Sequence, residues 1–185
     1  MSERVEAAPS ALILEHGDAL ANAARLGPLL DLACGGGRNT LAAARAGLPI
    51  IGIDQDAKAL ARLDRVASEA GLDLSCVRAD LETSFGIPIK SRSCGAVLVF
   101  RFLYRPLAPA IATLLAPGGL LLYETFTIHQ KNLSQGPRNP AFLLESGELT
   151  TLFPTLEILA FEELTLSEPW PQSVARLVAR RPGPG

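Results

Sequence analysis

The sequence contains few residues of the types that form covalent or metal cross-links. Only three of its 185 residues are cysteine and two are histidine. Cys34, Cys76 and Cys94 are far apart and form no C-x-x-C pair. We therefore expect neither a disulfide framework nor a bound metal. Free thiols also fit a reducing compartment, so the cytoplasm is the predicted location.

An excess of positive charge is also missing. The chain has 17 Lys and Arg against 19 Asp and Glu, which gives a net charge of −2 at pH 7. A protein that binds an extended nucleic acid carries a basic surface. We therefore expect no extended nucleic-acid partner.

No uninterrupted apolar segment is long enough to cross a membrane. The N-terminal segment MSERVEAAPS has charges of both signs and no apolar run, so it is not predicted to be a signal peptide. The uncharged stretch between Arg105 and Glu124 is near the length of a bilayer-crossing helix, but Pro109 and residues 117–119 interrupt it. We interpret it as a helix, a turn and a strand of a soluble core, and we expect no membrane partner.

The composition is that of one folded domain. Apolar residues make up 48% of the chain and charged residues 19%. A chain of this length can bury roughly 70% of its unfolded surface without cross-links. We predict a single domain over residues 1–185, with an N-terminal helical extension at 1–28 and a frayed tail at 181–185.

Short apolar runs alternate with helical segments along the chain. Five buried strands are predicted, at residues 29–33, 49–53, 73–77, 95–100 and 120–125. Two more strands, at about 156–162 and 173–179, have no long helix between them and are expected to pair antiparallel. Strands that are apolar on both faces indicate a sheet covered by helices on two sides. The predicted fold class is therefore α/β, with a doubly wound, mostly parallel sheet of seven strands whose last strand is antiparallel.

A glycine turn follows the first predicted strand. Residues 31–37 read DLACGGG, so three glycines lie where a strand passes into a helix. Ligands of open parallel sheets bind at the carboxyl ends of the strands, and glycine allows the backbone to approach a ligand closely. The turn predicts a nucleotide-like ligand.

Acidic residues at strand ends narrow the class of ligand. Asp54 ends the second strand, where a carboxylate can bind ribose hydroxyls, and Asp80 follows the third, where an acid can accept from adenine. Either one can instead be a helix cap or turn former. A dinucleotide motif needs a third glycine where this chain has Thr40, and the charge of Asp31 repels a pyrophosphate but attracts an ammonium group. The residues favour an amino-acid-bearing nucleoside, with an NAD-type oxidoreductase as the alternative.

The segments DLACGGG, IIGID, VRADLE and LAPGGLLLYETF resemble the successive motifs of class I S-adenosylmethionine-dependent methyltransferases. The resemblance extends from about Leu29 to Thr125. The segment CGGGRNTLAAARAG is similar to the bacterial tellurite-resistance-type branch of small single-domain members. The resemblance implies a Rossmann-like methyltransferase fold and S-adenosyl-L-methionine as the cofactor.

The resemblance also implies roles for individual residues. Asp31 would face the methionine ammonium group, Asp54 the ribose hydroxyls and Asp80 the adenine amino group. Arg38 and Asn39 are additions typical of the branch, and capping of the following helix is an equally good interpretation of them. The other implied cofactor contacts are Ala33, Cys34, Gly35, Gly37, Gln55, Leu81 and Phe100.

The acceptor side is less defined, because methyl transfer depends mainly on alignment and needs no nucleophilic residue. The (Asp/Asn)-Pro-Pro-(Tyr/Phe/Trp) motif of enzymes that methylate adenine amines or glutamine amides is absent after the fourth strand. Arg101, Tyr104 and Glu124 are the substrate-side candidates, with Arg105 as a second possible anion ligand. Packing or an ion pair across the strand ends is the ordinary alternative for them.

The predicted function is therefore methyl transfer by in-line displacement to a small-molecule substrate, an anionic acceptor being one candidate. A degenerate fold that only binds a nucleoside is a further alternative. Residues 130–140 are a candidate lid over the site, since methyl transfer needs water to be excluded.

Overall fold

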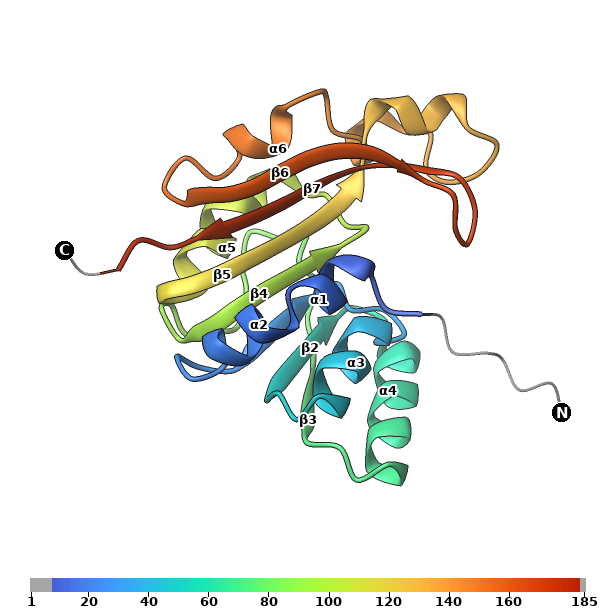
Figure 1. Cartoon of the computed structure of the whole chain (residues 1–185). Coiled ribbons are helices and arrows are strands. Elements are labelled where there is room, and N and C mark those ends of the chain that lie inside the picture. Colours follow the sequence, from blue (N-terminus) through green and yellow to red (C-terminus); the bar gives the residue numbers. More distant parts are fainter. Residues whose placement is uncertain (1–7, 184–185) are drawn as a thin grey trace, which may run out of the picture.

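One sheet of seven strands organises the computed structural model, which describes residues 8–183 (Figure 1). The strand order is β3-β2-β1-β4-β5-β7-β6. Strands β1 to β5 are parallel, and β7 pairs antiparallel with both β5 and β6. The predicted doubly wound α/β fold with an antiparallel last strand is confirmed. The strands are β1 (Leu29–Leu32), β2 (Ile50–Asp54), β3 (Leu74–Arg78), β4 (Cys94–Phe100), β5 (Leu115–Phe126), β6 (Glu157–Leu166) and β7 (Gln172–Arg180).

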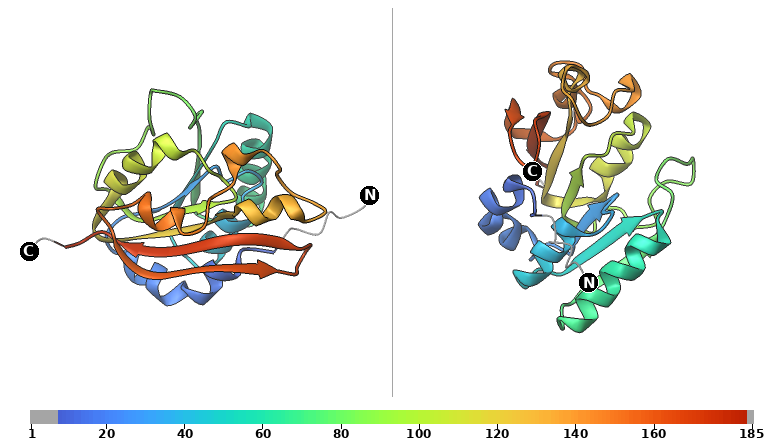
Figure 2. Two further views of the ribbon diagram at one scale, coloured as in Figure 1. Left: turned by 90° about the horizontal axis from the view of Figure 1, so that it is seen from above. Right: turned by 90° about the vertical axis from the view of Figure 1, so that its right-hand side faces the viewer.

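Helices cover both faces of the sheet (Figure 2). Successive side chains of a strand point to opposite faces, so Leu29 packs with the cluster under α1, α2 and α3 while Leu30 packs with the cluster under α5 and α6. Helix α4 packs against β2 and β3. The helices are α1 (Ala11–Glu15), α2 (Gly17–Ala23), α3 (Arg38–Arg45), α4 (Ala57–Glu69), α5 (Ala108–Leu114) and α6 (Glu148–Thr151), with 3₁₀ turns at Arg105–Leu107, Ile128–Asn132 and Pro140–Phe142.

The N-terminal helices lie directly on the sheet because β4 carries a glycine beneath them. A Cβ atom at Gly95 would lie 2.0 Å from the backbone oxygen of Ala23 in α2. Such an approach is open only to glycine, since a backbone atom has no freedom to rotate away. The start of the described chain is thereby held across β4 and β5, close to the edge where the parallel strands end.

Three local predictions differ from the structure. The helix predicted in the uncharged stretch after Arg105, at residues 106–115, begins as a 3₁₀ turn and becomes α-helical only at Ala108, and β5 already starts at Leu115. Residues 117–119 belong to β5, whose register against β4 shifts there. The expectation that the tail frays from residue 181 is wrong for Arg181, which exchanges backbone hydrogen bonds with residues 118 and 119. The remaining tail residues 184–185, and the segment 1–7 of the predicted extension, lie outside the described residues.

The connection from β3 to β4 contains no helix and carries Asp80 at its start. Its first residues, 79–82, line a cavity at the carboxyl ends of β1 and β2. Within residues 8–183, no helix combines the length and the apolar character needed to cross a membrane.

Candidate functional site

The glycine turn between β1 and α3 has the backbone geometry that the sequence predicts. Gly35 and Gly37 have φ angles of 54° and 76°, in the left-handed region that favours glycine. A Cβ atom at Gly35 would meet no atom within 4 Å, so this residue faces open space. A Cβ atom at Gly37 would lie 2.4 Å from the side chain of Leu63. Gly35 thus leaves room for a ligand, while Gly37 lets the turn pack against α4.

Asp54 connects the glycine turn to the end of β2. Its Oδ2 accepts a hydrogen bond from the backbone N–H of Gly35 at 2.8 Å, and its Oδ1 accepts from the N–H of Asp56 at 2.8 Å. An ionised carboxylate has about four lone-pair positions, so about two remain for other donors. This donor set fits the two hydroxyls of a ribose.

A cavity of about 70 Å³ adjoins Asp54 and brings several predicted residues together. Asp80 accepts from the N–H of Glu82 through Oδ1 at 2.9 Å, and its Oδ2 has no partner in the described chain. The backbone N–H of Leu81 likewise has no acceptor within residues 8–183. One free acceptor beside one free donor matches the edge of an adenine ring. The lining residues are Ala33, Asp54, Gln55, Ala79, Asp80, Leu81, Glu82 and Phe102.

Asp31 lies beneath the turn and is 2% exposed. Its Oδ2 accepts a hydrogen bond of 2.6 Å from the hydroxyl of Thr40. Burial raises the pKa of Asp31 to about 7, although the Thr40 hydroxyl and the charge of Arg38 act in the opposite direction. A ligand ammonium group near this carboxylate would favour the ionised form.

Cys34 has the environment of an inert thiol. Burial raises its pKa, and the neighbouring carboxyl groups of Asp31 and Asp54 raise it further. The thiol therefore stays protonated, and Cys34 acts as a small side chain in the turn.

A second, larger cavity of about 580 Å³ lies on the other side of the turn. It contains three of the predicted residues, Arg38, Arg101 and Glu124, on the elements α3, β4–α5 and β5. Parallel strands that end at one edge place these residues together. The full lining consists of Ala8, Pro9, Ser10, Ala11, Arg38, Arg101, Glu124, Leu166, Ser167, Glu168, Pro169 and Arg176.

Glu124 forms an ion pair inside this cavity wall. Its Oε2 accepts from Nε of Arg176 at 2.8 Å and from the hydroxyl of Ser10 at 3.0 Å. Both side chains are buried, and the two residues are directly opposite each other in the β5–β7 register. Arg176 was not predicted as a site residue. Its signal in the sequence is a single charge in the otherwise uncharged predicted strand 173–179.

Arg101 is the residue of the cavity with the least satisfied side chain. Its backbone has a φ of 57°, and its N–H donates to the carbonyl of Glu124. The Nε atom is buried and has no hydrogen-bond partner among the described residues, and the guanidinium carbon lies 5.8 Å from the centroid of the Trp170 ring. Burial lowers the pKa of Arg101, and the charge of Arg38 adds to this effect.

Arg38 and Asn39 hold the N-terminal segment against the site. Arg38 donates to the carbonyl oxygen of Ala8 at 3.0 Å, and the side-chain oxygen of Asn39 accepts from the N–H of Ser10 at 2.9 Å. Gly37 is the N-cap of α3, and the helix has no side-chain cap. The alternative role of these residues as helix caps is therefore wrong.

Three other candidates lie away from both cavities. Phe100 is buried in the cluster with the N-terminal helices, and Tyr104 packs against the opposite core cluster. The guanidinium group of Arg105 binds the carboxylate of Glu148, with Nη2–Oε2 at 2.8 Å, and donates to two carbonyl oxygens of the chain. Four of the five N–H donors of Arg105 are therefore engaged within the chain, whereas Nε of Arg101 has no partner among the described residues.

Phe102 was missed by the sequence analysis. It lines the cavity at Asp54 and also a cavity of about 320 Å³ that it shares with Arg101. Pro137 of the predicted lid segment and Phe142, just beyond it, line the same cavity. Phe100 and Phe102 are two positions apart in FRFLY, and no local signal separates them, because the strand end decides which ring faces the ligand edge.

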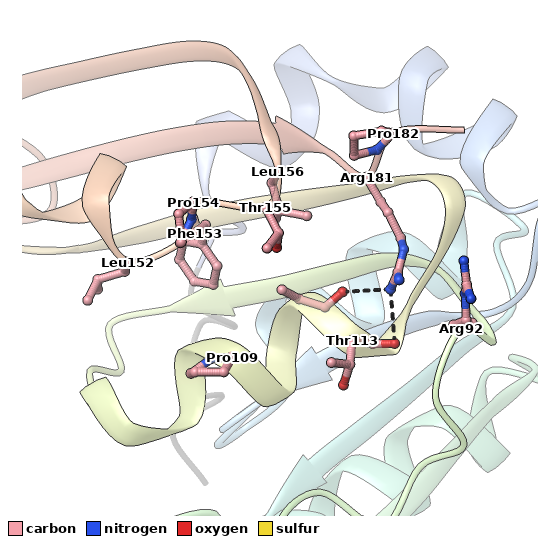
Figure 3. Close-up of a pocket in the computed structure, with 11 residues that line it drawn as sticks. Arg92, Pro109, Thr113, Leu152, Phe153, Pro154, Thr155, Leu156, Arg181 and Pro182 are labelled. Carbon is pink, nitrogen blue, oxygen red and sulfur yellow. Dashed lines mark hydrogen bonds between the residues drawn. The ribbon is translucent and has the colours of Figure 1, made fainter. Parts of the chain in front are cut away.

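A further cavity of about 470 Å³ lies at the other end of the molecule, where α5 leads into β5. Figure 3 shows Arg181 pointing toward the carbonyl oxygens at the end of α5, where it donates to Ala112 and Thr113. Phe153 and Leu156 line this cavity. None of the predicted site residues lies there, so we assign the site to the edge with the glycine turn.

Comparison with known proteins identifies the relatives of this arrangement. Residues 29–119 match the family model of a methyltransferase domain. No curated protein matches the sequence. A protein studied for the conversion of a disulfide bond into a thioacetal group during echinomycin biosynthesis has a TM-score of 0.74 at 18% identity, over 96% of this chain and 84% of that chain.

Two further solved structures have the same fold. TehB from Haemophilus influenzae matches with a TM-score of 0.71 at 18% identity, over 90% of this chain and 62% of that chain. A SAM-dependent methyltransferase from Methanosarcina mazei matches with a TM-score of 0.71 at 17% identity, over 90% of this chain and 98% of that chain. At these identities the likeness to solved structures establishes the fold.

Proposed function

Residues 29–119 form a methyltransferase domain of the class I, S-adenosylmethionine-dependent type, and from this premise we propose that the chain methylates a small anionic acceptor. The observation that carries the proposal is the pair of cavities on either side of the glycine turn. One has the free acceptor and donor positions of Asp80 and Leu81, and the other has the unpaired guanidinium group of Arg101. We further propose that the chain acts as one domain in the cytoplasm.

S-adenosylmethionine supplies an electrophilic methyl group on a sulfonium sulfur when it is bound. In the proposed site Asp54 accepts from the ribose hydroxyls, Asp80 accepts from the adenine amino group, and Asp31 attracts the ammonium group. Arg101 orients the acceptor, and the segment at Ser10 limits the access of water. Ala33, Cys34, Gly35, Gly37 and Gln55 would complete the contacts to the cofactor.

Calorimetric titration with S-adenosylmethionine, S-adenosylhomocysteine and NAD tests the cofactor. We expect both sulfur compounds to bind and NAD not to bind. Binding of NAD alone would support the oxidoreductase alternative. Transfer of a labelled methyl group to small molecules of a cell extract separates an enzyme from a protein that only binds nucleosides.

The Asp54→Ala variant is expected to weaken cofactor binding by about 1–3 kcal/mol, the scale of lost charge-assisted hydrogen bonds. The measurement is the dissociation constant from calorimetry. Asp56→Ala is the matched control, because Asp56 is a carboxylate two residues away that caps α4 through the N–H groups of Lys58 and Ala59. An unchanged dissociation constant in Asp54→Ala would contradict the ribose assignment.

A further inference from the structure

The large cavity contains one cationic group that lacks a partner. Arg176 is paired with Glu124, and Arg38 donates to the carbonyl oxygen of Ala8. The Nε atom of Arg101, in contrast, is buried with no acceptor among the described residues. The Nη donors of Arg101 likewise have no acceptor among the described residues, and donors left unpaired in a cavity wall cost free energy, so this position favours a ligand that brings an oxygen acceptor to them. The Trp170 ring beside the guanidinium group helps to fix its plane.

The remaining wall of the cavity is largely apolar. The side chains of Ala8, Pro9, Ala11, Leu166 and Pro169 contribute to it. A volume of about 580 Å³ lies within the range of pockets for small organic ligands. The ligand that fits therefore has an apolar body and one anionic end. The planar guanidinium fork of Arg101 matches a carboxylate, which accepts two parallel hydrogen bonds.

The cavity offers no suitable base for an acceptor that must first lose a proton. Among its described lining residues there is no histidine, lysine, cysteine or tyrosine. Of its two acids, Glu124 is engaged by Arg176 and Ser10, and Glu168 is exposed to solvent. An alcohol or an ammonium group must give up a proton before or during methyl transfer, whereas a carboxylic acid is already ionised at neutral pH.

On the basis of the function proposed above, we propose that the acceptor is a carboxylic acid with an apolar body, which is bound through Arg101 and converted to its methyl ester. One carboxylate oxygen forms a bond to the methyl carbon as the carbon–sulfur bond breaks, and the electron pair of that bond stays on sulfur. No proton is released, because the negative carboxylate and the positive sulfonium become a neutral ester and a neutral thioether. The ester no longer pairs with Arg101, which favours its release.

Ligand binding tests the proposal without turnover. The full-length protein, saturated with S-adenosylhomocysteine, is titrated calorimetrically with hexanoate and 3-phenylpropanoate, and with their methyl esters and primary amides. We expect the acids to bind. The affinity of the neutral analogues should be lower by about tenfold or more, as for loss of a charged hydrogen bond. Equal binding of an acid and its ester, or binding of neither acid to protein that holds the cofactor product, would overturn the proposal.

The arginine is tested with a matched pair of variants. Arg101→Gln is expected to weaken binding of the acids about tenfold or more. Arg92→Gln is the control, because Arg92 also has a φ of 57° but lies at the far end of the sheet, in the cavity of Figure 3. We expect this control to bind the acids like the unmodified protein. The proposal fails if both variants bind them equally well.

The product provides a second readout. The protein is incubated with methyl-labelled S-adenosylmethionine and the small molecules of a cell extract, and the labelled product is treated with mild alkali. We expect the label to be released as methanol, since an ester is hydrolysed under these conditions. Label that resists alkali would overturn the carboxylate acceptor and leave methyl transfer intact. Absence of both cofactor binding and label transfer would instead contradict the proposed function itself.

Discussion

Replacing Glu124 by leucine is expected to lower the free energy of unfolding by about 3–5 kcal/mol. The substitution leaves Arg176 buried with only Glu162 nearby, at 3.4 Å, and the carboxylate of Glu162 is half exposed. The cost of an uncompensated buried charge is much larger than the benefit of an average hydrogen bond. Arg176→Met is expected to destabilise the protein by a similar amount, because the charge of Glu124 then keeps only the Ser10 hydroxyl as a side-chain hydrogen-bond partner and the unbonded charge of Arg101. Urea unfolding measures both effects.

The double variant Glu124→Leu/Arg176→Met separates coupling from simple loss of packing. Two apolar side chains of similar volume replace the whole pair, so we expect the double variant to be within about 1 kcal/mol of the unmodified protein. Retained cofactor binding in this variant would show that the ion pair has a structural role, which is to hold β5 and β7 together in the cavity wall. If the effects of the single variants add up in the double variant, the two charges are not coupled and the structural role assigned to the pair is incorrect.

The Asp31→Asn variant is expected to be more stable than the unmodified protein at pH 8 and to bind the cofactor more weakly. Burial raises the pKa of Asp31 from 3.8 to about 7, so the folded state holds its proton up to a higher pH than the unfolded chain does. The stability due to this proton is present below pH 4, decreases as the pH rises, and is lost above pH 7. The total is on the order of 4 kcal/mol, with a slope of about 1.4 kcal/mol per pH unit.

Unfolding at pH 5 and pH 8 tests this dependence. The unmodified protein loses the stability of Asp31 between these values, whereas the asparagine variant does not, so the difference between them grows with pH. Thr40→Val changes the pKa of Asp31 without replacing Asp31 itself. Because the Thr40 hydroxyl lowers this pKa, its removal should extend the loss of stability to higher pH. A constant difference between Asp31→Asn and the unmodified protein would show that Asp31 titrates normally.

Although Asp31→Asn should stabilise the fold at pH 8, we expect it to weaken cofactor binding. Loss of the Asp31 charge is expected to weaken S-adenosylhomocysteine about tenfold or more, since its ammonium group then has no counter-charge. Adenosine has no ammonium group, so its affinity should be the same for both proteins. Equal weakening of the two ligands would indicate damage to the turn and contradict the assignment of Asp31 to the ammonium group.

Much of the fold follows from the sequence because parallel strands are buried on both faces. Residues 94–100 of β4 are all buried, so the apolar run and its limits are visible without a partner strand. The positions of Asp54 and Asp80 follow from the same logic, since parallel strands of similar length end at one edge. The cavity at Asp54 brings these two together as the motif order predicts.

The contacts on the acceptor side depend on pairings that no local pattern contains. Arg101 and Arg105 are four residues apart and chemically identical, yet only Arg105 reaches Glu148, which lies 43 positions later. Glu124 and Arg176 are 52 positions apart and meet because β7 turns back beside β5. Such long-range pairs depend on the strand order of the complete sheet and not on residue spacing.

The hydrogen bonds that join Arg38 and Asn39 to residues 8 and 10 have a practical consequence for handling the protein. Ala8 and Ser10 are bound at the mouth of the large cavity, whereas Arg181 leaves the sheet at the opposite edge, near residues 118 and 119. A bulky group attached at residue 8 would therefore lie beside the acceptor entrance. Attachment at the carboxyl terminus keeps bulky fusions remote from that opening and suits immobilised binding assays.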